Sequence, residues 1–145
     1  MAMDISQEGV DLIKSFESCR LEPYQDSGGV WTDGWGNITD VVPGQAITQE
    51  QADSRLLSNL ALSVEQVNNC VTVDLNQHEF DALVSFDFNC GIGNLRSSTL
   101  LRLVNEEDFE GAAQEFEKWD HVSGKVCAGL LRRRLAEKAE FQESP

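Results

Sequence analysis

Residues 16–36 read FESCRLEPYQDSGGVWTDGWG, and this stretch decides the expected fold. It holds two carboxyl side chains in unlike surroundings, Glu17 and Asp26, and a hydroxyl side chain, Thr32, shortly after them. The glycines between and beyond them let the backbone turn sharply. Two carboxyls in separate environments with a hydroxyl nearby are typical of a glycosidase cleft.

A helix is expected directly before this stretch. Ser6 is a good N-cap residue, and Ile5 and Val10 have the spacing of the apolar pair that fixes how a chain enters a helix. The helix should run to about Phe16, which leaves Glu17 at or just past its C-terminal end. The partial negative charge of that end favours a protonated carboxyl, which is the state that a general acid needs.

From residue 21 to residue 39 the helical period is absent, and turn residues separate short runs rich in Tyr, Trp, Val and Thr. This pattern predicts a small antiparallel hairpin with Asp26 near its first turn and Thr32 in the following strand. Trp31 and Trp35 are expected on one face of a continuous strand, opposite Thr32. They would either fill the core or face a sugar.

The remainder of the chain is predicted to be helical. After a loop at 41–47, Thr48 and Gln51 form a capping box, and apolar residues at helical spacing from Ala52 to Val67 predict a long helix of about five turns. Shorter helices are expected at four places: from Asn76 to about 90, near 98–104, over 109–116 and over 128–142. No strand is expected after residue 40.

The predicted fold class is α+β and predominantly helical, with a small N-terminal lobe that carries the hairpin sheet and a larger helical C-terminal lobe. Residues 1–145 are expected to form a single domain. Its N-terminal lobe would cover about 15–60, and its helical lobe would cover about 61–145 plus the first helix. The long helix would join the lobes, and a groove is expected between them.

Composition excludes some partners. The chain has 11 Lys and Arg against 25 Asp and Glu, so its net charge is −14, which argues against nucleic acid or an anionic membrane as the main partner. Neither an export segment nor membrane insertion is expected, because residues 1–16 carry charges where a signal peptide is apolar and no apolar run is long enough to cross a bilayer. We expect a monomer.

No metal or cofactor is predicted. The cysteines are widely spaced and are interpreted as buried free thiols, with one or two disulfides as the alternative in an oxidising compartment: Cys19, Cys70, Cys90 and Cys127. His78 and His121 are isolated in the sequence. Roles on a helix surface or in a loop are therefore favoured over metal binding.

Hydrolysis of a glycosidic bond needs a carboxylic acid to protonate the leaving oxygen and a second polar group to support the attack. Glu17, beside the apolar Phe16, suits the acid. Asp26, in a solvated turn, suits an ionised partner that polarises a water held by Thr32. The alternative is a helix-end Glu and a turn-forming Asp that are both simply solvated, since acids nine residues apart also occur by chance.

The sequence resembles the phage-type lysozymes, or muramidases, of glycoside hydrolase family 24. That family's pattern of Glu, then Asp nine residues on, then Thr six further on is matched by Glu17, Asp26 and Thr32. More segments match in the same order, so that the resemblance covers about residues 4–142: Gly28-Gly29-Val30-Trp31-Thr32, Gly34-x-Gly36, residues 76–86, Asn89-x-Gly91-x-Gly93, Ser97-Ser98-Thr99-Leu100-Leu101 and Gly129-Leu130-Leu131-Arg132-Arg133-Arg134.

The resemblance implies a lysozyme-like fold and cleavage of the β-1,4 bond between N-acetylmuramic acid and N-acetylglucosamine in peptidoglycan glycan strands, without a cofactor. Glu17 would be the acid, and Asp26 and Thr32 would support attack from the opposite side, by an inverting course, with a retaining course as the alternative. Three residues of the matching segments are expected to bind substrate: Asn89, Ser97 and Arg133. Either Arg133 or Arg134 is expected to lie against Glu17, and the alternative for both is a solvated helix face.

The resemblance also implies an endolysin that is made in the host cytoplasm and causes host lysis. It would act on the cell wall in the periplasm after a separate protein has permeabilised the membrane. One alternative is a catalytically silent muramidase-like module that binds peptidoglycan or serves as a scaffold. Another is a secreted effector that uses the same chemistry against competitors.

Two positions depart from the family's pattern. Most relatives have Gly-Tyr-Gly-His where this chain has Gly34-Trp35-Gly36-Asn37, so an ion pair that the histidine could make is missing. Asp33 stands where an apolar residue is common. These departures put the stability of the small lobe in question more than catalysis.

Overall fold

The structure is a computed structural model of the chain, and it describes residues 2–145. The chain divides into two compact units. Unit 1 comprises the residues up to Leu12 and those from Ser63 to Pro145, and unit 2 comprises Ile13–Leu62. The helices α1 (Gln7–Phe16) and α2 (Gln49–Cys70) each contribute residues to both units.

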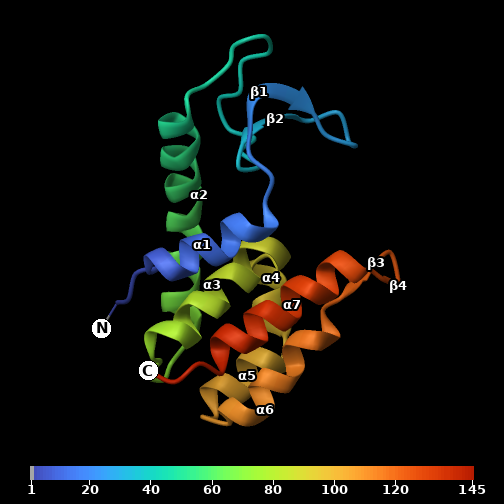
Figure 1. Cartoon of the computed structure of the whole chain (residues 1–145). Coiled ribbons are helices and arrows are strands. Elements are labelled where there is room, and N and C mark those ends of the chain that lie inside the picture. The colour runs from blue at the N-terminus through green and yellow to red at the C-terminus, as the bar shows by residue number, and fades with distance from the viewer. Residues whose placement is uncertain (1) are drawn as a thin grey trace. The chain divides into compact units, whose positions relative to one another are not determined.

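Unit 2 carries the predicted hairpin. Strand β1 (Arg20–Gln25) pairs antiparallel with β2 (Trp31–Gly34), and the register is irregular between Arg20 and Tyr24. This irregularity surrounds Pro23, which has no N–H to donate to a ladder. The α+β class and the hairpin are therefore confirmed (Figure 1).

Gly34 shows why the hairpin ends in glycine. Its φ is +52°, and a Cβ at this position would lie 3.3 Å from Ala52 of α2, so that a larger residue would be both strained and crowded. The apolar core of unit 2 lies around this contact and includes Ile13, Ile47, Ala52, Leu56 and Leu60.

The predicted capping box at Thr48 forms, and a second one is present at the start of the next helix. At the start of α2, the Gln51 N–H donates to Thr48 Oγ1 at 3.1 Å, and the Thr48 N–H donates to Gln51 Oε1 at 2.9 Å. At the start of α3 (Gln77–Cys90), Asn76 and Glu79 exchange the same pair of bonds. Helix α2 has 22 residues, which is about six turns and slightly longer than expected.

Helix α3 is the centre of unit 1, and all of its residues from Phe80 to Asp87 are buried. It packs along α7 (Ala128–Phe141). Aromatic rings fill the space beside them, where Phe86 contacts both Phe116 and Trp119 edge to face. The remaining helices of unit 1 are α4 (Ile92–Ser97), α5 (Thr99–Asn105), α6 (Phe109–Glu115) and the 3-10 helix η1 (Phe116–Lys118).

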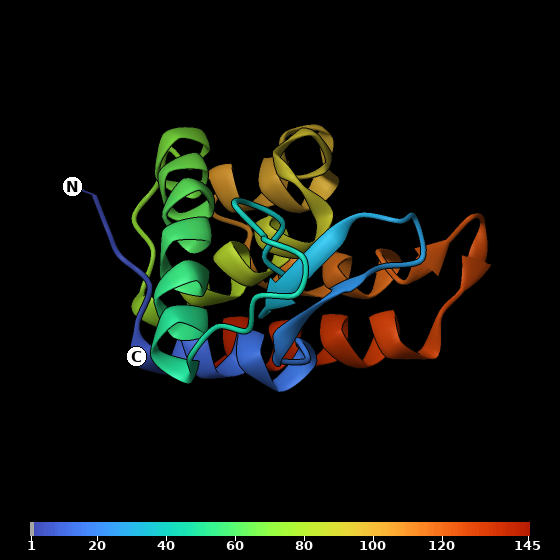
Figure 2. The same ribbon diagram turned by 90° about the horizontal axis from the view of Figure 1, so that it is seen from above.

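Two expectations about strands were wrong. A second hairpin, β3 (His121–Val122) with β4 (Lys125–Val126), lies just before α7 in unit 1 (Figure 2). Its strands are too short to show an alternating pattern, and positive φ angles at Ser123 and Gly124 make the turn. Trp31 and Trp35 do not share a continuous strand, because β2 ends at Gly34.

One short helix was not expected. Gly91 ends α3, and the residues after it, including Gly93, form the additional short helix α4. Among the described residues, none of the helices combines the length and the apolar character that crossing a bilayer requires.

Candidate active site

Glu17 directly follows the last residue of α1, as expected. Its N–H donates to the carbonyl of Ile13 at 3.1 Å and so closes the final helical turn. The side chain is half-buried, and Oε2 lies against Gly36: a Cβ at position 36 would be 3.6 Å from this oxygen. Helix α1 and the turn after β2 therefore position the carboxyl together.

Asp26 is exposed and organises the turn between β1 and β2. Its Oδ1 accepts the Gly28 N–H at 2.8 Å and the Val30 N–H at 2.9 Å. Its own N–H donates to the Val30 carbonyl at 2.9 Å. These bonds fix the direction of a carboxylate that faces solvent, which suits a group that must act on water.

Thr32 lies in β2, opposite Tyr24, and only 4% of its surface is exposed. Its Oγ1 donates to the Val30 carbonyl at 3.0 Å. Since a hydroxyl has one proton and two lone pairs, this bond leaves the oxygen able to accept a hydrogen bond. The side chain can therefore orient a water molecule but cannot move far while doing so.

The three predicted catalytic residues all belong to unit 2. Asp26 lies beside the Gln25–Trp31 pair at one end of the hairpin, and Glu17 contacts the turn that follows Gly34 at the other end. At a rise of about 3.3 Å per residue, Trp31 and Gly34 are about 10 Å apart. Asp26 and the turn that contacts Glu17 thus lie near opposite ends of a short strand.

A polar network links β2 and the turn after it to helix α2. Asp33 is fully buried and forms an ion pair with Arg55, and it accepts a hydrogen bond from Asn37 Nδ2 at 2.9 Å. Asn37 also donates to the Thr39 carbonyl at 2.8 Å and accepts from Asn59 at 3.1 Å. Asn37 and Asp33, which both depart from the family pattern, are therefore hydrogen-bonded to one another.

Trp35 lies beside this network and is also anchored to α2. Its indole N–H donates to Asp53 Oδ1 at 2.8 Å, and the Lys14 ammonium lies 5.2 Å from the ring centre. The hydrogen bond from Trp35, and then that from Gln49, lowers the pKa of Asp53. Trp35 thus fixes the turn that contacts Glu17, and it acts as a packing residue.

The predicted substrate-binding residues lie in unit 1, in three different settings. Arg133 is buried: its Nε donates to Glu137 Oε2 at 3.2 Å, and its Nη2 donates to the Ser85 carbonyl at 3.3 Å. Asn89 is exposed and accepts from Arg134 Nη2 at 2.8 Å. Ser97 is exposed and donates to the carbonyls of Gly93 and Asn94 within its own helix.

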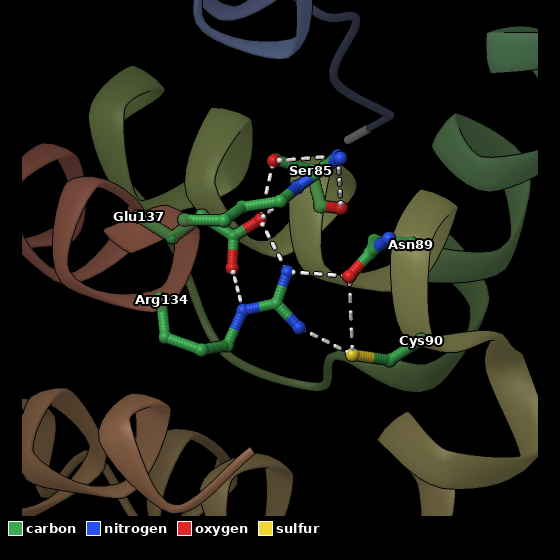
Figure 3. Close-up of polar contacts among 6 residues, drawn as sticks. Ser85, Asn89, Cys90, Arg134 and Glu137 are labelled. Carbon is green, nitrogen blue, oxygen red and sulfur yellow. Dashed lines mark hydrogen bonds and ion pairs between the residues drawn. The ribbon is translucent and has the colours of Figure 1, made fainter. Parts of the chain in front are cut away.

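Arg133 and Asn89 are joined through Glu137 and Arg134, whereas Ser97 bonds to carbonyl groups of its own helix. In Figure 3 the guanidinium of Arg134 lies between Glu137 on one side and Asn89 and Cys90 on the other. Arg134 and Glu137 are both fully buried. The alternative of a solvated helix face is therefore wrong for both Arg133 and Arg134.

Sequence reasoning missed Glu137 and Ser85, which complete this network. The Ser85 hydroxyl donates to Glu137 Oε2. Burial raises the pKa of Glu137, and the guanidinium groups of Arg134 and Arg133 oppose that rise. The helical spacing of the two arginines from Glu137 was the available signal, because residues three and four apart lie on one face of a helix.

Asn89 also lines a cavity of about 550 Å³ within unit 1. Trp119, His121 and Asn94 line the same cavity. An indole ring with neighbouring amide groups is a surface that can stack against and hydrogen-bond a polar ligand. This cavity is the setting in which Asn89 could contact a ligand.

Comparisons with known proteins identify the family. The family model "Phage lysozyme" matches residues 14–137. The chain is 44% identical over 142 residues to the endolysin of Bacillus phage B103, covering 96% of this chain and 54% of that protein. It is 41% identical over 146 residues to the endolysin of Acyrthosiphon pisum secondary endosymbiont phage 1, covering 98% of this chain and 100% of that protein.

A solved structure also resembles this chain. The muramidase domain of SpmX from Asticaccaulis excentricus is 43% identical and superimposes with a TM-score of 0.91 over 97% of this chain and 99% of the other. The chain spans about half the length of the Bacillus phage endolysin, so the match to that protein concerns one part of it. With its hairpin, its helical unit and this similarity along nearly its full length, the chain belongs to the phage lysozyme family.

Proposed function

We propose that the chain is a lysozyme of glycoside hydrolase family 24, an endolysin that cleaves the β-1,4 bond between N-acetylmuramic acid and N-acetylglucosamine in peptidoglycan. The observation that carries this proposal is the grouping of Glu17, Asp26 and Thr32 on one hairpin and the adjoining helix end. A single lysozyme-like domain, working as a monomer without a cofactor, is sufficient for this chemistry.

In the proposed reaction, Glu17 protonates the oxygen of the leaving sugar. Asp26, ionised in its solvent-facing turn, polarises a water that Thr32 orients, and this water attacks the anomeric carbon. The proposed course is a single displacement with inversion, in which the two carboxyl groups leave room for a water molecule between them and the sugar, whereas retaining enzymes hold their carboxyls only about 5 Å apart.

Asn89, Ser97 and Arg133 are proposed to bind the glycan. Asn89 is supported by its place on the cavity wall and Ser97 by its exposure. Arg133 would act by orienting neighbouring groups, because its guanidinium is committed to Glu137 and Ser85. The cellular route proposed is synthesis in the host cytoplasm, followed by access to the cell wall in the periplasm through a separate permeabilising protein.

The test compares the parent protein with Glu17→Gln on purified peptidoglycan. The parent should clear the suspension and release fragments with N-acetylmuramic acid at their reducing ends, and Glu17→Gln should do neither. Proton NMR of the first product should show the α-anomer if the course is inverting. Clearing by neither protein would instead support the catalytically silent module.

A further inference from the structure

Three side chains from distant parts of the sequence converge at one place in unit 1. His78 lies in the first turn of α3, Glu8 in the first turn of α1, and Glu140 in the last turn of α7. His78 Nδ1 is 2.8 Å from Glu8 Oε2 and 3.1 Å from Glu140 Oε1. One potential ligand atom from each residue lies within 4.8 Å of the others.

A hydrogen bond from His78 Nδ1 can satisfy only one of the two carboxylates that lie beside it. A ring nitrogen carries at most one proton, so Nδ1–H cannot make a well-aligned bond to two carboxylates at once. Two carboxylate groups also face one another across the ring nitrogen, and like charges at this separation repel. A divalent cation in place of the Nδ1 proton would bind all three groups and neutralise both carboxylates.

The distances suit such an ion. Zinc binds imidazole nitrogen at about 2.0–2.1 Å and carboxylate oxygen at about 2.0–2.2 Å, which makes neighbouring ligands of a tetrahedral site about 3.4 Å apart. The observed 2.8 Å and 3.1 Å need to open by only a few tenths of an ångström. The Glu8 side chain is 58% exposed, so an ion and a water as fourth ligand can enter from solvent.

We propose that Glu8, His78 and Glu140 form a binding site for a first-row divalent metal ion, with Zn²⁺ as the preferred occupant. One imidazole with two carboxylates is a borderline donor set that favours zinc over the hard cations calcium and magnesium. The bound ion links the start of α1 to α3 and α7. It stabilises unit 1 and takes no part in the proposed hydrolysis.

The first test uses untagged, chelator-treated protein and ZnCl₂ at pH 7.5. Isothermal titration should give one equivalent of bound zinc, and zinc should raise the midpoint of thermal unfolding. His78→Gln should weaken binding at least tenfold and lose the thermal shift. His121→Gln is the matched control, because His121 is the other histidine of the chain and its Nδ1 lies 2.6 Å from the carboxylate of Asp120, outside the cluster of Glu8, His78 and Glu140. It should bind as the parent does.

A second measurement does not depend on the folding of a His78 variant. In the His121→Gln protein His78 is the sole histidine, so ring ¹⁵N signals report on this site alone. Addition of one equivalent of zinc should shift the Nδ1 signal from that of a protonated or free nitrogen to that of a metal ligand. An unchanged ring spectrum, or equal zinc affinity in His78→Gln and the parent, overturns the proposal.

Discussion

The carboxyl of Glu17 lies directly against Gly36, with 3.6 Å between Oε2 and the place where a Cβ would be. Gly36 also has a φ of +81°, a conformation that glycine adopts without strain. The turn that approaches the proposed acid therefore favours glycine because of its backbone conformation, while a Cβ there would be in ordinary van der Waals contact with the carboxyl. The backbone strain and the contact can be separated by experiment.

Gly36→Ala should lower both stability and activity. The left-handed conformation should cost about 1–2 kcal/mol for alanine, and relaxation of that strain would move the turn that lies in van der Waals contact with the acid oxygen. Gly44→Ala is the matched control, because Gly44 has a φ of +82° in the same unit and nothing within 4 Å of its added Cβ. Both variants should lose similar free energy of unfolding, measured with urea. Only Gly36→Ala should clear peptidoglycan more slowly, by about tenfold; equal clearing rates would contradict the role of this contact.

Asp26→Asn should abolish most activity while leaving the hairpin folded. The amide oxygen can still accept the hydrogen bonds from Gly28 and Val30, but the negative charge is lost. Loss of a general base costs about 10²–10⁴-fold in rate. The measurements are the clearing rate and the thermal unfolding midpoint. Near-parent clearing by a folded Asp26→Asn protein would remove Asp26 from the proposed mechanism.

Asp87 makes the stability of unit 1 sensitive to pH. Its side chain is buried, and within residues 2–145 neither carboxyl oxygen has a hydrogen-bond partner of ordinary geometry, although Ser63 and Arg96 lie close enough to oppose the effect of burial. Burial raises the pKa of Asp87 from 3.8 to about 6. The folded state therefore holds this proton more tightly than the unfolded state does, and the resulting stability is present below pH 4 and lost as pH rises through 6.

The size of this effect follows from the shift. About two pKa units correspond to about 3 kcal/mol of unfolding free energy between pH 4 and pH 7. Asp87→Asn cannot titrate, so the difference in stability between the variant and the parent should increase in favour of the variant across this range. Urea denaturation at pH 4, 5, 6 and 7 measures the difference. A constant difference at all four pH values would show that Asp87 does not titrate there.

Arg134→Met should destabilise the protein strongly. It removes the guanidinium from the buried pair and leaves Glu137 buried with less compensation, and breaking a buried pair in this way costs about 3–5 kcal/mol. Arg132→Met is the control, because Arg132 is the exposed neighbour in the same helix turn. Its cost should stay within about 0.5 kcal/mol. Similar losses for the two variants, measured by urea denaturation, would contradict the importance of the buried network.

Local signals in the sequence were sufficient for most of the elements. Neighbouring residues determine the capping boxes at Thr48 and Asn76 and the turn at Asp26. These features can therefore be recognised without knowledge of the fold. Hairpin β3–β4 was missed because strands of two residues carry no period. The expected places of Glu17, Asp26 and Thr32 relative to their helix end, turn and strand agree with the structure.

Contacts between distant residues could not be predicted in the same way. Asp33 was recognised as unusual, but its partner Arg55 lies in the next helix and nothing in the local pattern connects them. His78 was interpreted as isolated because Glu8 and Glu140 are far from it in sequence, and only packing of α1, α3 and α7 brings them together. Such pairs depend on tertiary structure rather than on spacing.

The amide of Asn37 has a consequence for how the small unit responds to acid. An amide neither gains nor loses a proton between pH 5 and 8, whereas an imidazole at this position would change its charge in that range. The side chain of Asn37 bonds to Asp33, Thr39 and Asn59, so none of these bonds uses an imidazole. The strand that carries Thr32 should therefore stay in place while the surrounding compartment acidifies.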